Sequence, residues 1–314
     1  MMKHSFPLLL LTVLLATAGA RAAPDGWSPL LGPQSLADML ESNVELHILR
    51  VSGDHAAGHI PGSVAADYAD FRGPDGNPGA LPSLENLTEA VQALGLDGTR
   101  PVVLIHDGAS PSDMGTATRV YWTLKSLGVE DLAVLNGGFR AWQEAELPVS
   151  TGPVKASTTD WAPQWHDDWQ ITTREIEQRL DDADIRLIDA RPPAFFEGSQ
   201  SSIARPGTID GAASLSFDRW FEGNRLKSPE RIQQTLASSS LPRARETASF
   251  CNTGHWASIN WFVLSELAGI PDTRLYAESM AEWSQADRPM DNQPDRLAHY
   301  WDMTVDWFNG LWKR

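Results

Sequence analysis

The only cysteine of this chain, Cys251, stands between a strand-like apolar run and a segment with helical periodicity. A thiol at the start of a helix is surrounded by unpaired backbone N–H groups and the positive end of the helix dipole, which favour the thiolate and can also bind an oxyanion. The alternative is a small buried core residue. A core cysteine does not require the Asn-Thr-Gly turn and helix start that follow, so the sequence predicts a nucleophilic thiolate.

Two histidine-containing groups could be considered as metal sites. His55 and His59 are four residues apart, but Gly58 and Pro61 break any helix that would align them. His166, which precedes two aspartates, lacks the ligand spacing of a structural metal site. We therefore expect no metal ion.

Short apolar strands alternate with helices in both halves of the chain. In the first half the patterns predict strands at 46–51, 102–105 and 132–135, and helices at 35–40, 84–94 and 114–127. In the second half they predict strands at 186–190, 247–250 and 274–276, and helices at 173–180, 229–236 and 257–267. This order indicates an α/β fold in which parallel sheets are covered by helices on both faces. Ligands bind beyond the carboxyl ends of such strands, which is where Cys251 lies.

The two halves also repeat one another. At similar offsets, residues 58–63 pair with 206–212, 102–105 with 247–250, 126–128 with 267–269, and 138–142 with 279–283. The small drift in offset is what loop insertions produce. We predict two copies of one domain, residues 24–150 and 171–314, joined by a linker at 151–170 that contains Pro, Gly and Thr.

The N-terminal residues predict the compartment. Lys3 and His4 precede an apolar run from Phe6 to Ala18, and a small-x-small cleavage pattern ends at Ala22. We expect a signal peptide at 1–22 and a periplasmic or secreted protein, with no integral membrane contact after cleavage. An uncleaved anchor remains an alternative. With one cysteine, an intrachain disulfide is excluded even in an oxidising compartment.

The charge balance excludes some partners. The chain has 25 basic and 41 acidic side chains, a net charge of -16 at pH 7. Such a surface repels nucleic acid and anionic lipid, so we expect neither as a partner. The 13 tryptophans and 42% hydrophobic residues suffice for a packed globular protein.

Four segments of the sequence are together specific enough to point to a protein family. They are residues 58–62 (Gly-His-Ile-Pro-Gly), residues 135–142 (Leu-Asn-Gly-Gly-Phe-Arg-Ala-Trp), Asp189-Ala190-Arg191, and the Cys251 loop before a helix. Together they resemble the tandem-domain rhodanese-type sulfurtransferases, which include thiosulfate and 3-mercaptopyruvate sulfurtransferases, over nearly the whole chain. In that family the second domain usually carries the cysteine. This chain agrees, because the loop after Ile105 has no thiol.

The resemblance implies a two-step sulfur transfer without metal or organic cofactor. Cys251 would take a sulfane sulfur from a small donor such as thiosulfate or 3-mercaptopyruvate, and the persulfide would pass it to a thiol, cyanide or sulfite-like acceptor, a protein thiol included. The implied substrate-binding residues are Asn252, Thr253, Gly254, His255, Trp256 and Ala257, whose amides would hold the persulfide and an oxyanion, together with Asp189 and Arg191.

The active loop departs from both family subtypes. It has neither the basic residues of the thiosulfate enzymes nor the Gly-Ser-Gly-Val-Thr-like sequence of the mercaptopyruvate enzymes, and a second family arginine falls near Phe195. Arg191 or Arg205 would replace that anion contact, or each is a structural ion-pair partner. His255 is a proton donor, or assists formation of the thiolate, or is a solvent-facing loop residue. Trp256 either walls a pocket for an apolar or flat donor or shields the thiol from water.

Two other classes of function are possible for a cysteine in such a loop. A protein-tyrosine-phosphatase-like enzyme needs a Cys-x5-Arg loop, but the sixth residue after Cys251 is Ala257. A non-catalytic periplasmic binding or redox-relay module, which would use the cysteine-free domain for docking, remains the alternative.

The C-terminal tail carries one further pattern. Trp301, Val305, Phe308 and Trp312 share one helical face. The polar face of this segment is not lined by basic residues, so packing on the protein is favoured over membrane contact. We predict a helix that covers the seam between the two domains.

Overall fold

The computed structural model describes residues 23–294. The predicted signal peptide and the apolar stripe from Trp301 to Trp312 lie outside these residues. None of the helices within 23–294 is both long enough and apolar enough to cross a membrane.

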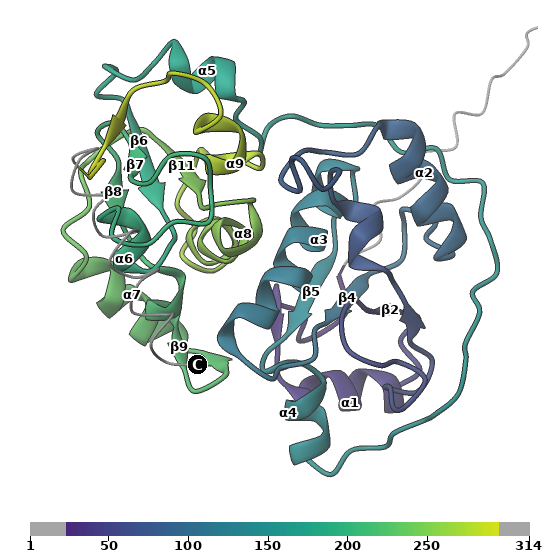
Figure 1. Cartoon of the computed structure of the whole chain (residues 1–314). Coiled ribbons are helices and arrows are strands. Elements are labelled where there is room, and N and C mark those ends of the chain that lie inside the picture. Colours follow the sequence, from purple (N-terminus) through teal and green to yellow (C-terminus); the bar gives the residue numbers. More distant parts are fainter. Residues whose placement is uncertain (1–22, 295–314) are drawn as a thin grey trace, which may run out of the picture.

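The first half folds around a five-stranded parallel sheet with strand order β1-β5-β4-β2-β3 (Figure 1). The strands are β1 (Leu30–Leu31), β2 (His47–Arg50), β3 (Val64–Ala65), β4 (Val102–Ile105) and β5 (Leu132–Leu135). β4 and β5 are buried along their whole length, as expected for central strands of a sheet covered on both faces.

Helices cover both faces of this sheet because alternate strand residues point to opposite sides. Val103 and Ile105 of β4 pack with α1 (Pro33–Glu41) and α4 (Gly138–Glu144). Val102 and Leu104 pack on the other face with α2 (Leu84–Ala93) and α3 (Met114–Ser126). Two short 3-10 turns, Tyr68–Phe71 and Pro111–Asp113, precede α2 and α3 respectively.

The second half has a four-stranded parallel sheet with the order β12-β11-β6-β8. Its strands are β6 (Ile185–Asp189), β8 (Ala213–Ser214), β11 (Glu246–Phe250) and β12 (Thr273–Leu275). Its helices are α5 (Thr173–Glu177), α6 (Pro193–Phe196), α7 (Pro229–Ala237), α8 (His255–Phe262) and α9 (Ser279–Trp283), and a π-helical segment, Val263–Leu267, continues α8. A 3-10 turn spans Phe217–Trp220. Two small antiparallel pairs join β7 (Thr208–Ile209) to β13 (Met290–Asp291) and β9 (Phe221–Glu222) to β10 (Arg225–Leu226).

The predicted fold class and repeat are confirmed. The order β5-β4-β2-β3 in the first sheet corresponds to β12-β11-β6-β8 in the second, strand for strand. Every strand and helix that the patterns predicted is present. The helix predicted at 257–267 corresponds to α8 together with the π-helical segment that continues it, and among the other elements the largest shift of a boundary is at α5, which ends at Glu177 rather than at residue 180. Residues 151–169 form neither helix nor strand, and this segment runs along the outside of the first half in Figure 1.

The two halves share one continuous hydrophobic core. Helices α3 and α8 lie side by side between the sheets (Figure 1), and buried residues of both belong to one cluster. Tyr121 packs edge-on against Phe262 at a centroid distance of 5.0 Å, and the hydroxyls of Thr118 and Ser258 are hydrogen-bonded at 2.7 Å. This packing places the first half directly against the helix that follows Cys251.

Candidate active site

Cys251 follows β11 directly, at the carboxyl edge of the second sheet. Its neighbour Phe250 pairs in register with Asp189, the last residue of β6. The loop ends at Gly254, whose left-handed φ of 72° turns the chain into α8. The predicted strand–loop–helix placement is confirmed, although α8 begins at His255 rather than at Ala257. The Cys251 side chain is only 1% exposed.

A serine that the sequence did not point to holds the loop in place. Ser279 Oγ accepts hydrogen bonds from the N–H groups of Cys251 and Gly254, both at 3.1 Å, and its hydroxyl donates to the Tyr276 carbonyl at 2.7 Å. The N–H of Met280 donates to the Cys251 carbonyl at 3.0 Å. The expectation that the Gly254 amide faces the sulfur is therefore corrected, because Ser279 already binds that N–H.

The first half has an equivalent loop that lacks the cysteine. His106 occupies the position of Cys251, and the N–H of Phe139 donates to the His106 carbonyl at 2.8 Å, as Met280 does to Cys251. The counterpart of Ser279 is Gly138, and both have left-handed backbones, with φ of 55° and 63°. A serine where the repeat has a glycine was the sequence signal for this residue, since side chains in this conformation are uncommon outside constrained sites.

The remaining loop amides are the candidates for anion binding. The first backbone bond of α8 runs from the Ser258 N–H to the Gly254 carbonyl, so the N–H groups of His255, Trp256 and Ala257 have no acceptor within the helix. Asn252 and Thr253 are half-buried between Cys251 and this helix start. These donors lie at the positive end of the helix dipole, where negative charge is stabilised.

Asp189 and Arg191 form a buried pair behind the loop. The ion pair joins Arg191 Nη2 and Asp189 Oδ2 at 2.6 Å, and both side chains are at most 1% exposed. Arg191 Nη2 also donates to the Gly207 carbonyl, and Nη1 donates to Asn252 Oδ1 at 3.1 Å. Its Nε donates to Asp189 as well. Because every guanidinium nitrogen is engaged, the expected substrate contact of this pair is not supported, and the geometry instead shows it orienting Asn252.

The other arginine considered from the sequence lies in a structural network. Arg205 Nε donates to the Ser284 carbonyl at 3.0 Å, and Nη2 donates to the Arg288 carbonyl at 3.0 Å. These contacts favour the structural alternative for Arg205.

His255 connects the loop to the first half. Its Nε2 lies 2.9 Å from the carbonyl oxygen of Ser112, and its Nδ1 lies 2.9 Å from the Tyr68 hydroxyl. A carbonyl only accepts, so Nε2 carries the proton and Nδ1 accepts from Tyr68. Burial, with the nearby positive charges of Arg72 and Arg119, lowers the pKa of His255 to about 4. Neither expected role fits: the ring is neutral at pH 7 and faces the first half.

We expect acid to destabilise the protein through His255 and His106. Burial lowers the pKa of each from 6.5 to about 4. Between these values the unfolded chain binds more protons than the folded one, so stability decreases as the pH falls through this window. From pH 7 to pH 5 each histidine should contribute a loss of about 2 kcal/mol.

Urea unfolding at both pH values measures this loss. His255→Gln should lose less stability on acidification than the wild-type protein, because glutamine does not titrate. An equal loss in both proteins would show that His255 is not one of the groups responsible.

Aromatic rings form one side of the site. Trp256 stacks on Phe217 at a centroid distance of 5.0 Å and packs edge-on against Phe195 at 6.1 Å. Its indole N–H donates to the Ser112 hydroxyl at 2.7 Å. Phe195, which lies near the position of the second family arginine, is thus part of an aromatic wall.

The first half supplies positive charge at the loop, which the sequence did not reveal. Arg119 of α3 is 0% exposed, and its Nη1 lies so close to Gly254 that a Cβ there would overlap with it. Arg72 donates to the Tyr68 hydroxyl at 3.1 Å. No sequence motif marks these residues, because their position at the loop depends on how the two halves pack together.

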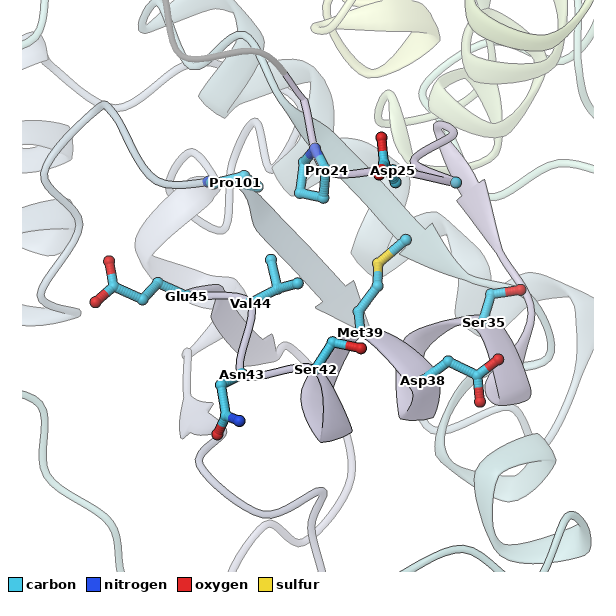
Figure 2. A pocket seen from close by; sticks show the side chains of 11 residues that line it. Pro24, Asp25, Ser35, Asp38, Met39, Ser42, Asn43, Val44, Glu45 and Pro101 are labelled. Atoms are coloured by element: carbon cyan, nitrogen blue, oxygen red, sulfur yellow. The ribbon is translucent and has the colours of Figure 1, made fainter.

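A pocket of the first half lies away from Cys251. Figure 2 shows it beside α1, between the segment from Pro24 to Gly26 and the segment from Ser42 to Glu45, with a volume of about 810 Å³. Its lining contains no cysteine, histidine or basic side chain. It therefore offers neither the nucleophile nor the cations that are found around Cys251.

Comparison with known proteins agrees with this geometry. The rhodanese-like domain model matches the chain twice, at residues 32–145 and 172–286. The chain is 30% identical to a candidate thiosulfate sulfurtransferase of Synechococcus elongatus, over 92% of this chain and 94% of that protein. It is 29% identical to the 3-mercaptopyruvate sulfurtransferase of Rattus norvegicus, over 74% of this chain and 78% of that protein.

A solved structure shows the same architecture. The crystal structure of a 3-mercaptopyruvate sulfotransferase of Escherichia coli covers 80% of this chain and 98% of its own, with a TM-score of 0.69 and 20% identity. Fold and site thus define a two-domain α/β protein with one cysteine at the start of a helix. The chain belongs to the rhodanese family, as a tandem-domain sulfurtransferase, and the predicted resemblance is confirmed.

Proposed function

We propose that the protein transfers a sulfane sulfur from a donor of the thiosulfate or 3-mercaptopyruvate type to a thiophilic acceptor through a persulfide on Cys251. The observation that carries this proposal is the position of the chain's only cysteine, between the carboxyl end of β11 and the first turn of α8. That position combines a nucleophile with unpaired backbone donors.

The first step requires only the Cys251 thiolate and thiosulfate, with no further reactant. The Cys251 thiolate attacks the outer sulfur, a new S–S bond forms at Sγ, and the original S–S bond breaks. Sulfite leaves with the electron pair, and the protein carries a persulfide anion. In the second step a nucleophilic acceptor such as cyanide attacks the outer persulfide sulfur, thiocyanate leaves, and the thiolate is restored.

The chain's own residues have separate roles in this scheme. Ser279 and Arg191 keep the loop in one conformation through their bonds to Gly254 and Asn252. The N–H groups at the start of α8 stabilise the negative charge of the persulfide and of the departing oxyanion. Because Cys251 is only 1% exposed, the side chains that cover it must move to admit a donor.

Mass spectrometry of the intact protein tests the proposal. After incubation with thiosulfate or 3-mercaptopyruvate, we expect one added sulfur atom, located on the peptide that contains Cys251, and its release as thiocyanate on addition of cyanide. A protein that gains no sulfur from either donor would instead support the binding or redox-relay alternative.

A further inference from the structure

Arg119 is a buried cation with unused hydrogen-bond donors. Its Nη2 donates to the Gly79 carbonyl at 2.9 Å, but Nε and Nη1 have no partner within residues 23–294. Burial lowers the pKa of Arg119 to about 10, so it remains charged at pH 7. An unpartnered charge in the interior is costly and needs an explanation.

In the other buried arginines of the described residues, every guanidinium nitrogen has a partner. Arg50 donates to the Ser52 and Gly58 carbonyls and forms an ion pair with Asp107 at 3.1 Å, and Arg191 is bonded through all three nitrogens. Among the arginines buried in the described part of the chain, only Arg119 has no carboxylate partner. Its free donors are therefore not a general property of this protein's interior.

No carboxylate forms an ion pair with Arg119 among the described residues. Glu278 interacts with it electrostatically, but no ion pair joins them among the described residues, and Glu278 Oε2 is itself without a partner. Burial raises the pKa of Glu278. Because Nε and Nη1 of Arg119 have no partner among the described residues, these two donors remain available to another anion.

The unused donors lie at the Cys251 loop. Arg119 Nη1 and the Ala277 carbonyl are the atoms that a Cβ on Gly254 would meet first, and the charge of a Cys251 thiolate is close enough to oppose the lowering of the Arg119 pKa. Phe195 and Trp256 contribute aromatic rings that pack edge-on against each other, and Arg191 is already bonded through all three guanidinium nitrogens. The cation with unused donors at this site therefore comes from the half of the protein that has no cysteine.

We propose that Arg119 binds the anionic group of the sulfur donor and so selects donors whose transferred sulfur is attached to an anion. This inference rests on the proposed function. A sulfonate or carboxylate oxygen would accept charge-assisted hydrogen bonds from Nη1 and Nε, whereas an uncharged donor gains nothing from them. The cysteine-free half thereby supplies an essential part of the substrate site.

Binding without turnover tests this inference. In full-length Cys251→Ser protein, which cannot form a persulfide, calorimetry would measure the Kd of thiosulfate and, separately, of 3-mercaptopyruvate. Adding Arg119→Met should weaken the binding of at least one of them about ten- to a hundred-fold, the usual effect of losing hydrogen bonds to a charged group. Arg119→Lys should retain part of the affinity, because it keeps the charge.

Arg50→Met is the matched control. It also removes a buried arginine of the first half, but one whose three guanidinium nitrogens all have partners, so the Kd should change less than about twofold, well under the tenfold that 1.4 kcal/mol represents. An unchanged Kd in Arg119→Met, or no measurable binding to the parent Cys251→Ser protein, overturns the inference. If Arg119→Met does not fold, Arg119→Lys decides: a lower affinity supports the inference and an unchanged one refutes it.

The two proposals can fail separately. Sulfur transfer by the wild-type protein together with Arg119-independent binding would refute the inference and leave the function intact. Arg119-dependent binding in a protein that never gains sulfur would do the reverse.

Discussion

Replacing Cys251 with serine should abolish sulfur transfer and leave the fold intact. Serine has a similar shape, and its hydroxyl is far less acidic and cannot form a persulfide. We expect the rate of thiocyanate formation from thiosulfate and cyanide to fall about a thousand-fold or more, as is usual when a nucleophile is removed. Steady-state kinetics, with circular dichroism as the check on folding, measures this effect.

Cys251→Ala is the companion variant, and it should be equally inactive. Retention of turnover within about tenfold of wild type by the serine variant would show that another group carries the sulfur, since tenfold corresponds to only 1.4 kcal/mol of barrier.

Replacing Gly254 with alanine should also cause a large loss of activity. Gly254 has a φ of 72°, which costs alanine about 1–2 kcal/mol, and its new Cβ would overlap with Arg119 Nη1 and the Ala277 carbonyl. The loop must shift to relieve this overlap, and a displacement of about 1 Å at a reacting group can cost about a hundred-fold in rate.

Gly211 provides the matched control for this variant. It has nearly the same backbone, with a φ of 71°, but nothing lies within 4 Å of a Cβ placed on it. In urea unfolding, Gly211→Ala should therefore lose only the about 1–2 kcal/mol that the left-handed backbone costs alanine. Its turnover should stay at the wild-type value. If Gly254→Ala were as active as Gly211→Ala, the close packing of the loop against Arg119 would not matter for catalysis.

The fold was predictable from the sequence because its central elements have strong periodicity. β4 and β5 are continuous apolar runs, and α2 and α3 start and end within one residue of the predicted boundaries. Strands of two residues, such as β1 and β3, are too short to show any period, so the sequence does not predict them. The sequence also does not predict the short α9 as a helix, although residues 279–283 belong to the repeat.

Only those parts of the site that are close together in the sequence could be predicted. Cys251 and the helix start lie within one segment, so their relation can be read from the order of residues. Ser279 reaches the loop from the next strand–helix connection, and Tyr68 and Arg119 reach it from the other half of the protein. Such contacts follow from packing between elements, and among these residues only Ser279 has a sequence signal, the glycine at the equivalent position of the first half. The contacts of His255 with Tyr68 and Ser112 of the first half could not be predicted for the same reason.

The contacts between α3 and α8 bear on how this protein evolved. After a duplication, the copy without a nucleophile is free to accumulate substitutions or to be deleted. Here Ser258 and Phe262 of α8 pack against Thr118 and Tyr121 of the first copy, and His255 is bonded to Tyr68. A descendant that kept only the second copy would expose this helix to water and lose the partner of His255. Loss of the first copy would therefore disturb the helix that follows Cys251, which disfavours its deletion.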